Sequence, residues 1–254
     1  MPEKHYNINY LEGTALILKN IKENSYKPFT AVKEGKVVDL GCGPGIDAIN
    51  LSSLLGEKVH VTGIDHDPVM IEKARSSASG VSNIDFVIAE AYPVPFEDEA
   101  IEGARAERLL QHLQEPEVLT KEVYRVLKPE GSFVVVETDW SSLSFYNADR
   151  TTAGKVNEYL TDKKVKNGAV ARQLTGLLHA SGFKDITLEI YPFVVRSVRE
   201  IYAYLLIDQS LKEMLDKGFL SASEYNSFVH SLEEAESKGF FSCTLNLVIA
   251  SGKK

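Results

Sequence analysis

Cysteine is scarce in this 254-residue chain, which holds only Cys42 and Cys243 and no CxxC pair. Two distant cysteines give neither a disulfide framework nor a zinc-binding pattern. Long apolar runs are also missing: Ile201–Ile207 (IYAYLLI) is among the longest, whereas a membrane span needs about 20 residues. The first ten residues are polar and show no signal-peptide pattern. We therefore expect a protein without a membrane span in a reduced, cytoplasmic compartment.

An excess of basic charge is absent as well. The chain has 28 Lys and Arg against 36 Asp and Glu, a formal net charge of −8. This balance disfavours non-specific binding to nucleic acids and anionic membranes, although it leaves room for a local basic patch. We therefore expect a small-molecule partner rather than a nucleic acid. The composition leaves the oligomeric state open between monomer and homodimer.

Short β-branched runs alternate with helical patterns between residues 36 and 138. The runs predict strands at Val37–Leu40, Val59–Asp65, Ile84–Ala89, Ile101–Ala104 and Ser132–Glu137. Helices are predicted between them at Ile46–Leu55, Pro68–Ser79 and Glu117–Leu127. This alternation is typical of βαβ units and of a parallel sheet with buried strands, so the fold class is α/β.

The two ends of the chain are more helical. Before residue 35, apolar residues at helical spacing predict a helix and a loop: Leu11, Ala15, Leu18 and Ile21. After Trp140 we expect helices at Asp149–Lys164, Val170–Ser181, Val198–Lys217 and Ser221–Lys238, and strands at Ile186–Val195 and Phe240–Ala250. The resulting parse is a single domain, 1–254. Its parts are an N-terminal helical cap segment 1–34, a core 35–142, helical cap insertions 143–168 and 196–238, and a last strand 239–254.

A glycine-rich loop follows the first predicted strand and opens a predicted helix. It reads Asp39-Leu40-Gly41-Cys42-Gly43-Pro44-Gly45. Glycines permit a tight turn and close approach of a ligand, and the free N–H groups at the helix start favour anionic groups. The spacing differs from the dinucleotide fingerprint GxGxxG because position 46 is Ile. The alternative interpretation is a glycine-rich turn that binds nothing.

Three further motifs follow in order. The second strand ends in Gly63-Ile64-Asp65-His66-Asp67-Pro68, the third leads into 89–96 (AEAYPVPF), and the fourth leads into 104–113 (ARAERLLQHL) before the turn 125–131 (RVLKPEG). Together with the glycine loop, these motifs resemble class I S-adenosylmethionine (SAM)-dependent methyltransferases, in particular the ubiquinone/menaquinone-methyltransferase group. The resemblance covers residues 35–138. Glu90 stands where relatives commonly have Asp, and Ala89 where they have Gly.

The resemblance implies a Rossmann-like, mostly parallel seven-stranded sheet with helices on both faces, a helical cap, and Phe240–Ala250 as an antiparallel strand inserted beside the last parallel one. It implies SAM as cofactor and S-adenosylhomocysteine (SAH) as product. The implied cofactor-binding residues are Asp39, Gly41, Cys42, Gly43, Gly45, Asp65, His66, Met70, Glu90, Ala91 and Ala106. Asp65 would accept ribose hydroxyls; its alternative role as a cap of the next helix suits Asp67 better, since Asp67 directly precedes Pro68.

Candidate residues on the acceptor side are fewer. His112 follows the fourth strand and is a candidate general base, or else a packing histidine. Asp139 and Trp140 leave the fifth strand at its carboxyl end, where ligands bind in open α/β sheets, or else they are a helix cap and a buried indole. Arg108 could bind a polar substrate or pair with Glu107 on the surface. Aromatic residues of the predicted cap could form an apolar pocket or only the cap's own core: Tyr6, Tyr10, Phe145, Tyr146, Tyr202 and Tyr204.

The sequence thus predicts methyl transfer from SAM to O, N or C of a small organic acceptor, aromatic or lipophilic in character, without a metal. Three alternatives remain: a protein or RNA methyltransferase, a SAM-binding module without turnover, and an NAD-dependent oxidoreductase, against which Ile46 counts.

Overall fold

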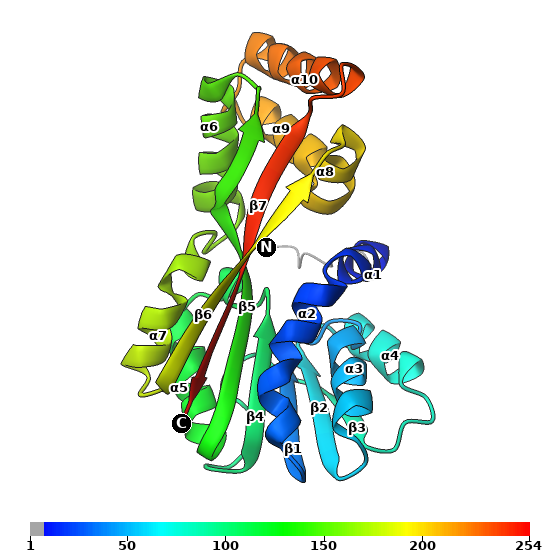
Figure 1. Cartoon of the computed structure of the whole chain (residues 1–254), viewed down its shortest axis with the longest axis vertical. Helices are drawn as coiled ribbons and strands as arrows, with labels where there is room; N and C mark the ends of the chain where they lie inside the picture. The colour runs from blue at the N-terminus through cyan, green and yellow to red at the C-terminus, as the bar shows by residue number, and fades with distance from the viewer. Residues whose placement is uncertain (1–7) are drawn as a thin grey trace. The chain divides into compact units, whose positions relative to one another are not determined.

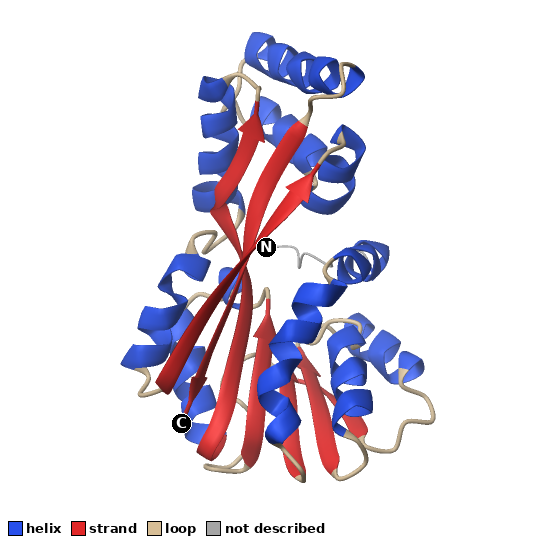
Figure 2. Cartoon of the chain, in the orientation of Figure 1, coloured by secondary structure: helices blue, strands red, loops and turns tan. Residues whose placement is uncertain are grey.

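The predicted strands assemble into one seven-stranded sheet in the computed structural model, which describes residues 8–254. The sheet order is β3-β2-β1-β4-β5-β7-β6 (Figures 1 and 2). The strands are β1 (Gly35–Leu40), β2 (Val59–Asp65), β3 (Ile84–Ile88), β4 (Ile101–Glu107), β5 (Leu127–Tyr146), β6 (Lys184–Val195) and β7 (Ser242–Lys253). β1 pairs in parallel with β2 and β4, β2 with β3, and β4 with β5. The predicted α/β class and mostly parallel sheet are confirmed.

β7 runs antiparallel to β5. The end of β7 lies beside the start of β5, because the Glu130 amide donates to the Lys254 carbonyl at 3.1 Å and the Lys254 amide donates to the Gly131 carbonyl at 3.0 Å. The sheet order places β7 between β5 and β6. The inserted antiparallel last strand is therefore confirmed.

Helices cover both faces of the parallel part. The side chains of neighbouring residues in a strand point to opposite faces. On β4, a side chain at Gly103 would meet Phe29, which lies in η1 (Lys27–Ala31). Ala104 is paired instead with Phe133, whose ring lies 5.8 Å from that of Phe183, a residue in the connection that leads from α7 into β6. The helices η1 and α7 (Leu174–Ala180) therefore flank opposite faces.

The remaining helices connect the strands. Before and within the parallel part they are α1 (Ile8–Ile17), α2 (Lys19–Tyr26), α3 (Ile46–Leu55), α4 (Pro68–Ser77), η2 (Leu110–His112) and α5 (Pro116–Val126). After β5 they are α6 (Arg150–Tyr159), η3 (Leu160–Lys164), η4 (Val170–Gln173), α8 (Val198–Leu205), α9 (Ile207–Asp216) and α10 (Ala222–Ser237). Within residues 8–254, none of these helices combines the length and the apolar character that crossing a membrane requires.

The chain divides into two compact units. Among the described residues, the first unit comprises 8–137, 173–189 and 248–254, and the second comprises 138–172 and 190–247. The second unit has its own apolar core, which includes Val156, Ile201, Leu211 and Phe228. Besides the helices expected for a cap, it contains one end each of β5, β6 and β7. The predicted boundaries between core and cap segments stay predictions.

Two predicted helices are wrong in their continuity. The pattern over Val198–Lys217 forms α8 and α9, because Leu206 between them adopts a left-handed conformation with φ 52°. The apolar face from Leu11 to Ile21 likewise spans α1 and α2, which are separated at Leu18. In both places the apolar spacing continues across the break, so periodicity alone does not reveal it.

Candidate functional site

The glycine loop forms a tight connection between β1 and α3. Gly41, Gly43 and Gly45 have φ of +68°, +51° and +83°, values that residues with a side chain rarely adopt. Space is also limiting at Gly45, where a Cβ atom would lie 2.8 Å from the Cβ of Ala74 and 2.9 Å from the Phe86 ring. At Gly43, by contrast, the nearest atom would be 3.8 Å away. The loop therefore packs tightly against the protein at one end and leaves its middle backbone approachable.

Asp65 ties the end of β2 to this loop. Its Oδ2 accepts from the Gly43 amide at 2.8 Å, and its Oδ1 accepts from the Asp67 amide at 2.9 Å. Asp67, not Asp65, is the N-cap of α4, since its side chain accepts from the Val69 amide at 2.8 Å. The predicted division of roles between the two aspartates is confirmed for the cap. Each carboxylate oxygen of Asp65 can accept a further hydrogen bond, so the group can also bind hydroxyls.

The other residues predicted on the cofactor side lie on neighbouring elements of the first unit. His66 is exposed, with Nδ1 3.3 Å from Asp65 Oδ1, and Met70 is buried in α4. Glu90 is exposed after β3, where the preceding Ala89 amide donates to the Asp65 carbonyl at 3.1 Å. Cys42 is buried, and burial raises the pKa of its thiol, which makes the thiolate scarce.

Ala106 and Asp39 belong to adjacent strands beneath the loop. Ala106 is buried and is paired with Leu40. Asp39 is buried too, and burial raises the pKa of its carboxyl. Its partner is Arg105 in the middle of β4, whose Nη1 lies 3.2 Å from Asp39 Oδ1. The acid that begins the glycine loop is therefore held by a buried guanidinium.

Arg105 is the centre of a buried ionic network that joins β1, β4, α2 and α3. Its Nη2 contacts Glu107 and lies 3.6 Å from Asp47 Oδ1. Lys22 of α2 bridges the same two acids, with Nζ 2.6 Å from Asp47 Oδ2 and 2.6 Å from Glu107 Oε1. Tyr26 donates to Asp47, and its ring lies 5.3 Å from the Arg105 guanidinium.

Burial opposes the ionisation of Glu107, but Lys22 and Arg105 outweigh it and hold the pKa of that carboxyl well below its usual range. Glu107 therefore stays charged. Arg108 adds a third cation, with Nε 3.4 Å from Glu107 Oε1 and Nη2 3.4 Å from Thr14 Oγ1. The pair of Glu107 and Arg108 is mostly buried, not a surface pair, because only 7% and 19% of the two side chains are exposed.

His112 closes the turn η2 that follows β4. Its ring Nε2 lies 3.1 Å from Nε2 of Gln111, whose side chain also donates to the Arg108 carbonyl at 3.2 Å. His112 is exposed, whereas Gln111 is buried. Glu137, the last residue of β5 in the first unit, accepts from the Leu110 amide at 2.6 Å. This carboxyl therefore anchors the turn that carries His112.

Asp139 and Trp140 lie in the second unit. Asp139 is buried and pairs with Arg172, whose Nε is 3.0 Å from Oδ2, and it accepts from the Ser141 hydroxyl. The Trp140 amide donates to the Gly168 carbonyl at 3.1 Å, and its carbonyl accepts from Asn157 at 3.0 Å. Asp139 is therefore an ion-paired carboxylate on a strand and not a helix cap.

The predicted aromatic residues have different surroundings. Phe145 and Trp140 pack against the core of the second unit, and the Phe145 ring meets Phe228 edge-on at 5.4 Å. Tyr146 is about half exposed at the end of β5. Tyr10 is half-buried in α1, and Tyr6 lies outside the described residues. Phe145 thus has a packing role of the kind expected for a cap core, and its role toward a substrate stays a prediction.

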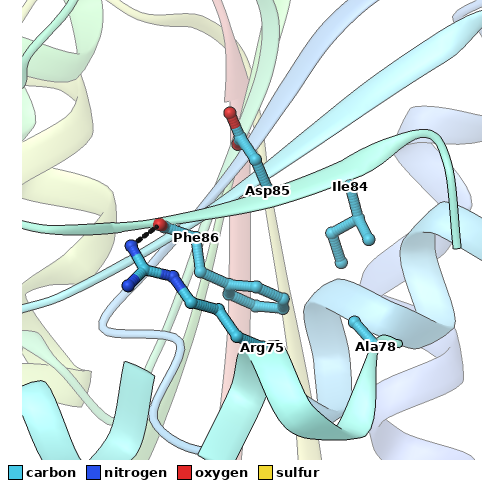
Figure 3. A pocket seen from close by; sticks show the side chains of 5 residues that line it. All are labelled: Arg75, Ala78, Ile84, Asp85 and Phe86. Atoms are coloured by element: carbon cyan, nitrogen blue, oxygen red, sulfur yellow. Dashed lines mark hydrogen bonds between the residues drawn. The ribbon is translucent and has the colours of Figure 1, made fainter. Parts of the chain in front are cut away.

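A surface hollow lies between α4 and the edge strand β3. Arg75, Ala78, Ile84, Asp85 and Phe86 line it, and Arg75 donates to the Phe86 carbonyl at 2.7 Å (Figure 3). None of the predicted site residues lines this hollow. Phe86 connects this hollow with the glycine loop, since its ring also packs at Gly45 and Gly63.

Residues 31–214 match a family model described as a methyltransferase domain. The chain belongs to this methyltransferase-domain family. The sequence resemblance to class I SAM-dependent methyltransferases is thereby confirmed.

Relatives and solved structures agree with this membership. The chain is 32% identical over 213 residues to an uncharacterised 37.1 kDa protein of transposon TN4556 from Streptomyces fradiae, covering 84% of this chain and 61% of that protein. It is 34% identical over 116 residues to demethylmenaquinone methyltransferase from Staphylococcus aureus, covering 45% and 48%. The chain thus matches about half to three-fifths of these relatives' length. Its fold is similar to YcgJ from Bacillus subtilis, with a TM-score of 0.61, 19% identity, and 91% and 98% of the two chains covered.

Sequence reasoning missed the buried charges of this methyltransferase-domain chain. Arg105 is a charged residue between two alanines in a central parallel strand, and such strands are buried on both faces. A buried guanidinium requires acidic partners, so Arg105 itself was the available signal. Glu137 gave a similar signal, because it ends the apolar run Ser132–Glu137. Lys22 and Asp47 gave none, since both lie at ordinary helix positions.

Proposed function

We propose that the protein is a SAM-dependent methyltransferase that transfers a methyl group to O, N or C of a small organic acceptor and releases SAH. The observation that carries this proposal is the glycine loop, with Asp65 hydrogen-bonded to the Gly43 amide, in a chain of the methyltransferase-domain family. The named relative, demethylmenaquinone methyltransferase, supports a small-molecule acceptor. The absence of a net basic charge agrees with a small acceptor rather than RNA.

The residues present suit a nucleoside bearing a sulfonium. The loop backbone at Gly43 is approachable, and Asp65 retains acceptor capacity for two ribose hydroxyls beside it. Glu90 would accept a hydrogen bond from the exocyclic amine of adenine, and the Ala91 amide would donate one to the adenine ring. His66 and Met70 would lie beside the nucleoside. When bound, SAM supplies a methyl carbon on a sulfur leaving group.

For such a transfer the protein mainly orients the acceptor and excludes water, which is worth about 7–11 kcal/mol for well-oriented pairs. We assign His112 as the base that takes a proton where the acceptor must lose one. Its position on the turn after β4 and its exposed ring support this role. Asp139 and Trp140 remain proposed acceptor-side residues, and Asp139 would act as a fixed charge paired with Arg172.

Replacement of Asp65 tests the cofactor site. Asp65→Ala removes the acceptor for ribose hydroxyls and the anchor of the Gly43 amide, so we expect SAH binding to weaken at least tenfold, about 1.4 kcal/mol or more. Calorimetric titration with SAH measures the effect. Asp85→Ala is the matched control, since Asp85 is an exposed carboxylate on the neighbouring strand, 3.5 Å from His60. Wild-type protein that binds NAD and not SAH would refute the proposal.

A further inference from the structure

Glu137 is a fully buried carboxyl with one oxygen occupied and one oxygen unpartnered. Its Oε1 accepts from the amides of Leu110 at 2.6 Å and Gln111 at 3.4 Å. Its Oε2 is buried, and no described residue makes a hydrogen bond with it. An ionised carboxylate with an unpaired buried oxygen costs far more free energy than the neutral acid. The geometry therefore favours a proton on Glu137.

The charged neighbours do not reverse this preference. The positive charge of Arg108 favours the ionised form of Glu137, and the negative charge of Glu107 opposes it. His112 is a third titratable group near Glu137, because it belongs to the turn η2 that Glu137 holds. Arg108 is already paired with Glu107, whose Oε1 lies 3.4 Å from its Nε, and this pairing weakens the electrostatic stabilisation that Arg108 gives to an ionised Glu137. Burial is the largest effect, and it raises the pKa of Glu137 to about 8.

The turn that Glu137 holds leads back to the glycine loop. The Arg108 amide donates to the Val136 carbonyl at 2.7 Å, and Arg108 adopts a left-handed φ of 50°. Leu109, the next residue, packs on the loop so closely that a Cβ at Gly41 would lie 3.0 Å from its Cδ1. A shift of the turn would therefore reach both the loop and the side chains of Gln111 and His112.

We propose that Glu137 is a positioning residue of the methyl-transfer site. Held as the neutral acid, it fixes the turn from Arg108 to His112, and through that turn it places His112 and supports the glycine loop. The proposal rests on the proposed function only in naming the site, because the effect of Glu137 on the turn is independent of which reaction the protein performs.

The wild-type protein and two variants of Glu137 test this role. Glu137→Gln keeps an acceptor oxygen without a titratable proton, and Glu137→Ala removes the acceptor. We expect the amides of Leu110 and Gln111 to exchange with solvent at least tenfold faster in Glu137→Ala, and within threefold of wild type in Glu137→Gln. SAH affinity should fall at least fivefold in Glu137→Ala and should stay within twofold of the wild-type value in Glu137→Gln. Equal behaviour of the two variants would overturn the proposal.

A pH profile tests the protonation of Glu137, and the His112 resonances test whether that protonation reaches the site. In the folded protein Glu137 keeps its proton up to pH about 8, whereas the unfolded chain releases it near the ordinary value of 4.5. The contribution of this group to stability is therefore largest below pH 4.5 and is lost as the pH rises toward 8. We expect the melting temperature of Glu137→Gln, relative to wild type, to rise between pH 5 and pH 8.5, and the wild-type His112 resonances to shift with a midpoint near 8 that the variant lacks.

Glu122→Gln is the control, because Glu122 also accepts a backbone amide, that of Val94 at 3.1 Å, but its pKa is lowered by Arg125. The melting temperature of Glu122→Gln, relative to wild type, should not rise between pH 5 and pH 8.5. If Glu137→Ala does not fold, the pH profile of Glu137→Gln decides alone, and a profile parallel to wild type overturns the proposal. Wild-type protein that fails to bind SAH contradicts the proposed function, while the exchange and pH readouts still test Glu137.

Discussion

Arg105 is the shared cation of three buried acidic residues inside the first unit. A guanidinium in the middle of a buried strand is stable only with acidic partners, and here Asp39, Asp47 and Glu107 surround it. These partners come from β1, α3 and β4, so the charges fix how three elements meet beneath the glycine loop. Burial lowers the pKa of Arg105, but the acids outweigh that effect and raise it.

Removal of Arg105 leaves three buried acids without their shared cation. For Arg105→Met we expect the free energy of unfolding to fall by about 3–5 kcal/mol, the usual cost of breaking a buried ion pair. Urea denaturation at pH 7 measures it. Arg125→Met is the matched control, because Arg125 pairs with Asp98 and Glu122 but is one-third exposed. Its loss should cost about 1 kcal/mol or less. Equal losses in the two variants would contradict the role given to the network.

The glycine loop is the element whose geometry follows most directly from its sequence. Its glycines all have positive φ, and the strand before it and the helix after it begin and end close to their predicted positions. Gly45 and Gly56 lie at the two ends of α3 with φ of +83° and +77°, but only Gly45, with ψ of 11°, is in the left-handed helical region, whereas Gly56 has ψ of 175°. They differ in space: a Cβ at Gly45 meets Ala74 and Phe86, and a Cβ at Gly56 meets nothing within 4 Å.

This difference makes a paired test of the loop. Gly56→Ala should cost about 1–3 kcal/mol of stability, because φ near +77° with ψ near 175° is a backbone region that only glycine readily adopts. Gly45→Ala should cost about 1–2 kcal/mol for a left-handed alanine and about 1–3 kcal/mol more for overpacking against Ala74 and Phe86. SAH affinity should fall only in Gly45→Ala, since only that variant displaces the loop. Thermal unfolding and calorimetric titration measure the stability and the SAH affinity, and equal SAH affinities in the two variants would refute the packing argument.

The sequence predicted elements where local chemistry decides the structure. β-branched runs, Pro68 at a helix start and the glycine loop each act within a few residues, and β2 has the predicted bounds. It did not predict the length of β5, which extends from Leu127 to Tyr146, because pairing with distant β7 carries that strand past Glu137. Nor did it predict the break at Leu206, since tertiary packing holds a residue with no turn preference in a left-handed conformation.

At the scale of the whole molecule, the chain consists of a first unit with the methyltransferase topology and a second unit with a separate apolar core. The family model covers residues 31–214 and so includes parts of both. Fold and family membership do not determine which acceptor is methylated. The sequence accordingly predicted the family, whereas the acceptor-side roles of Asp139 and Trp140, which lie outside the recognised motifs, stay predictions.

Transfer of a labelled methyl group tests the central claim most directly. Purified protein is incubated with isotope-labelled SAM and an extract of the source cells, and the products are separated into small-molecule and macromolecular fractions, with Asp65→Ala as the control. We expect label in the small-molecule fraction, and much less of it with Asp65→Ala when labelled SAM is limiting. Label confined to protein or RNA would contradict the proposed acceptor class, and no label from protein that binds SAH would contradict methyl transfer itself.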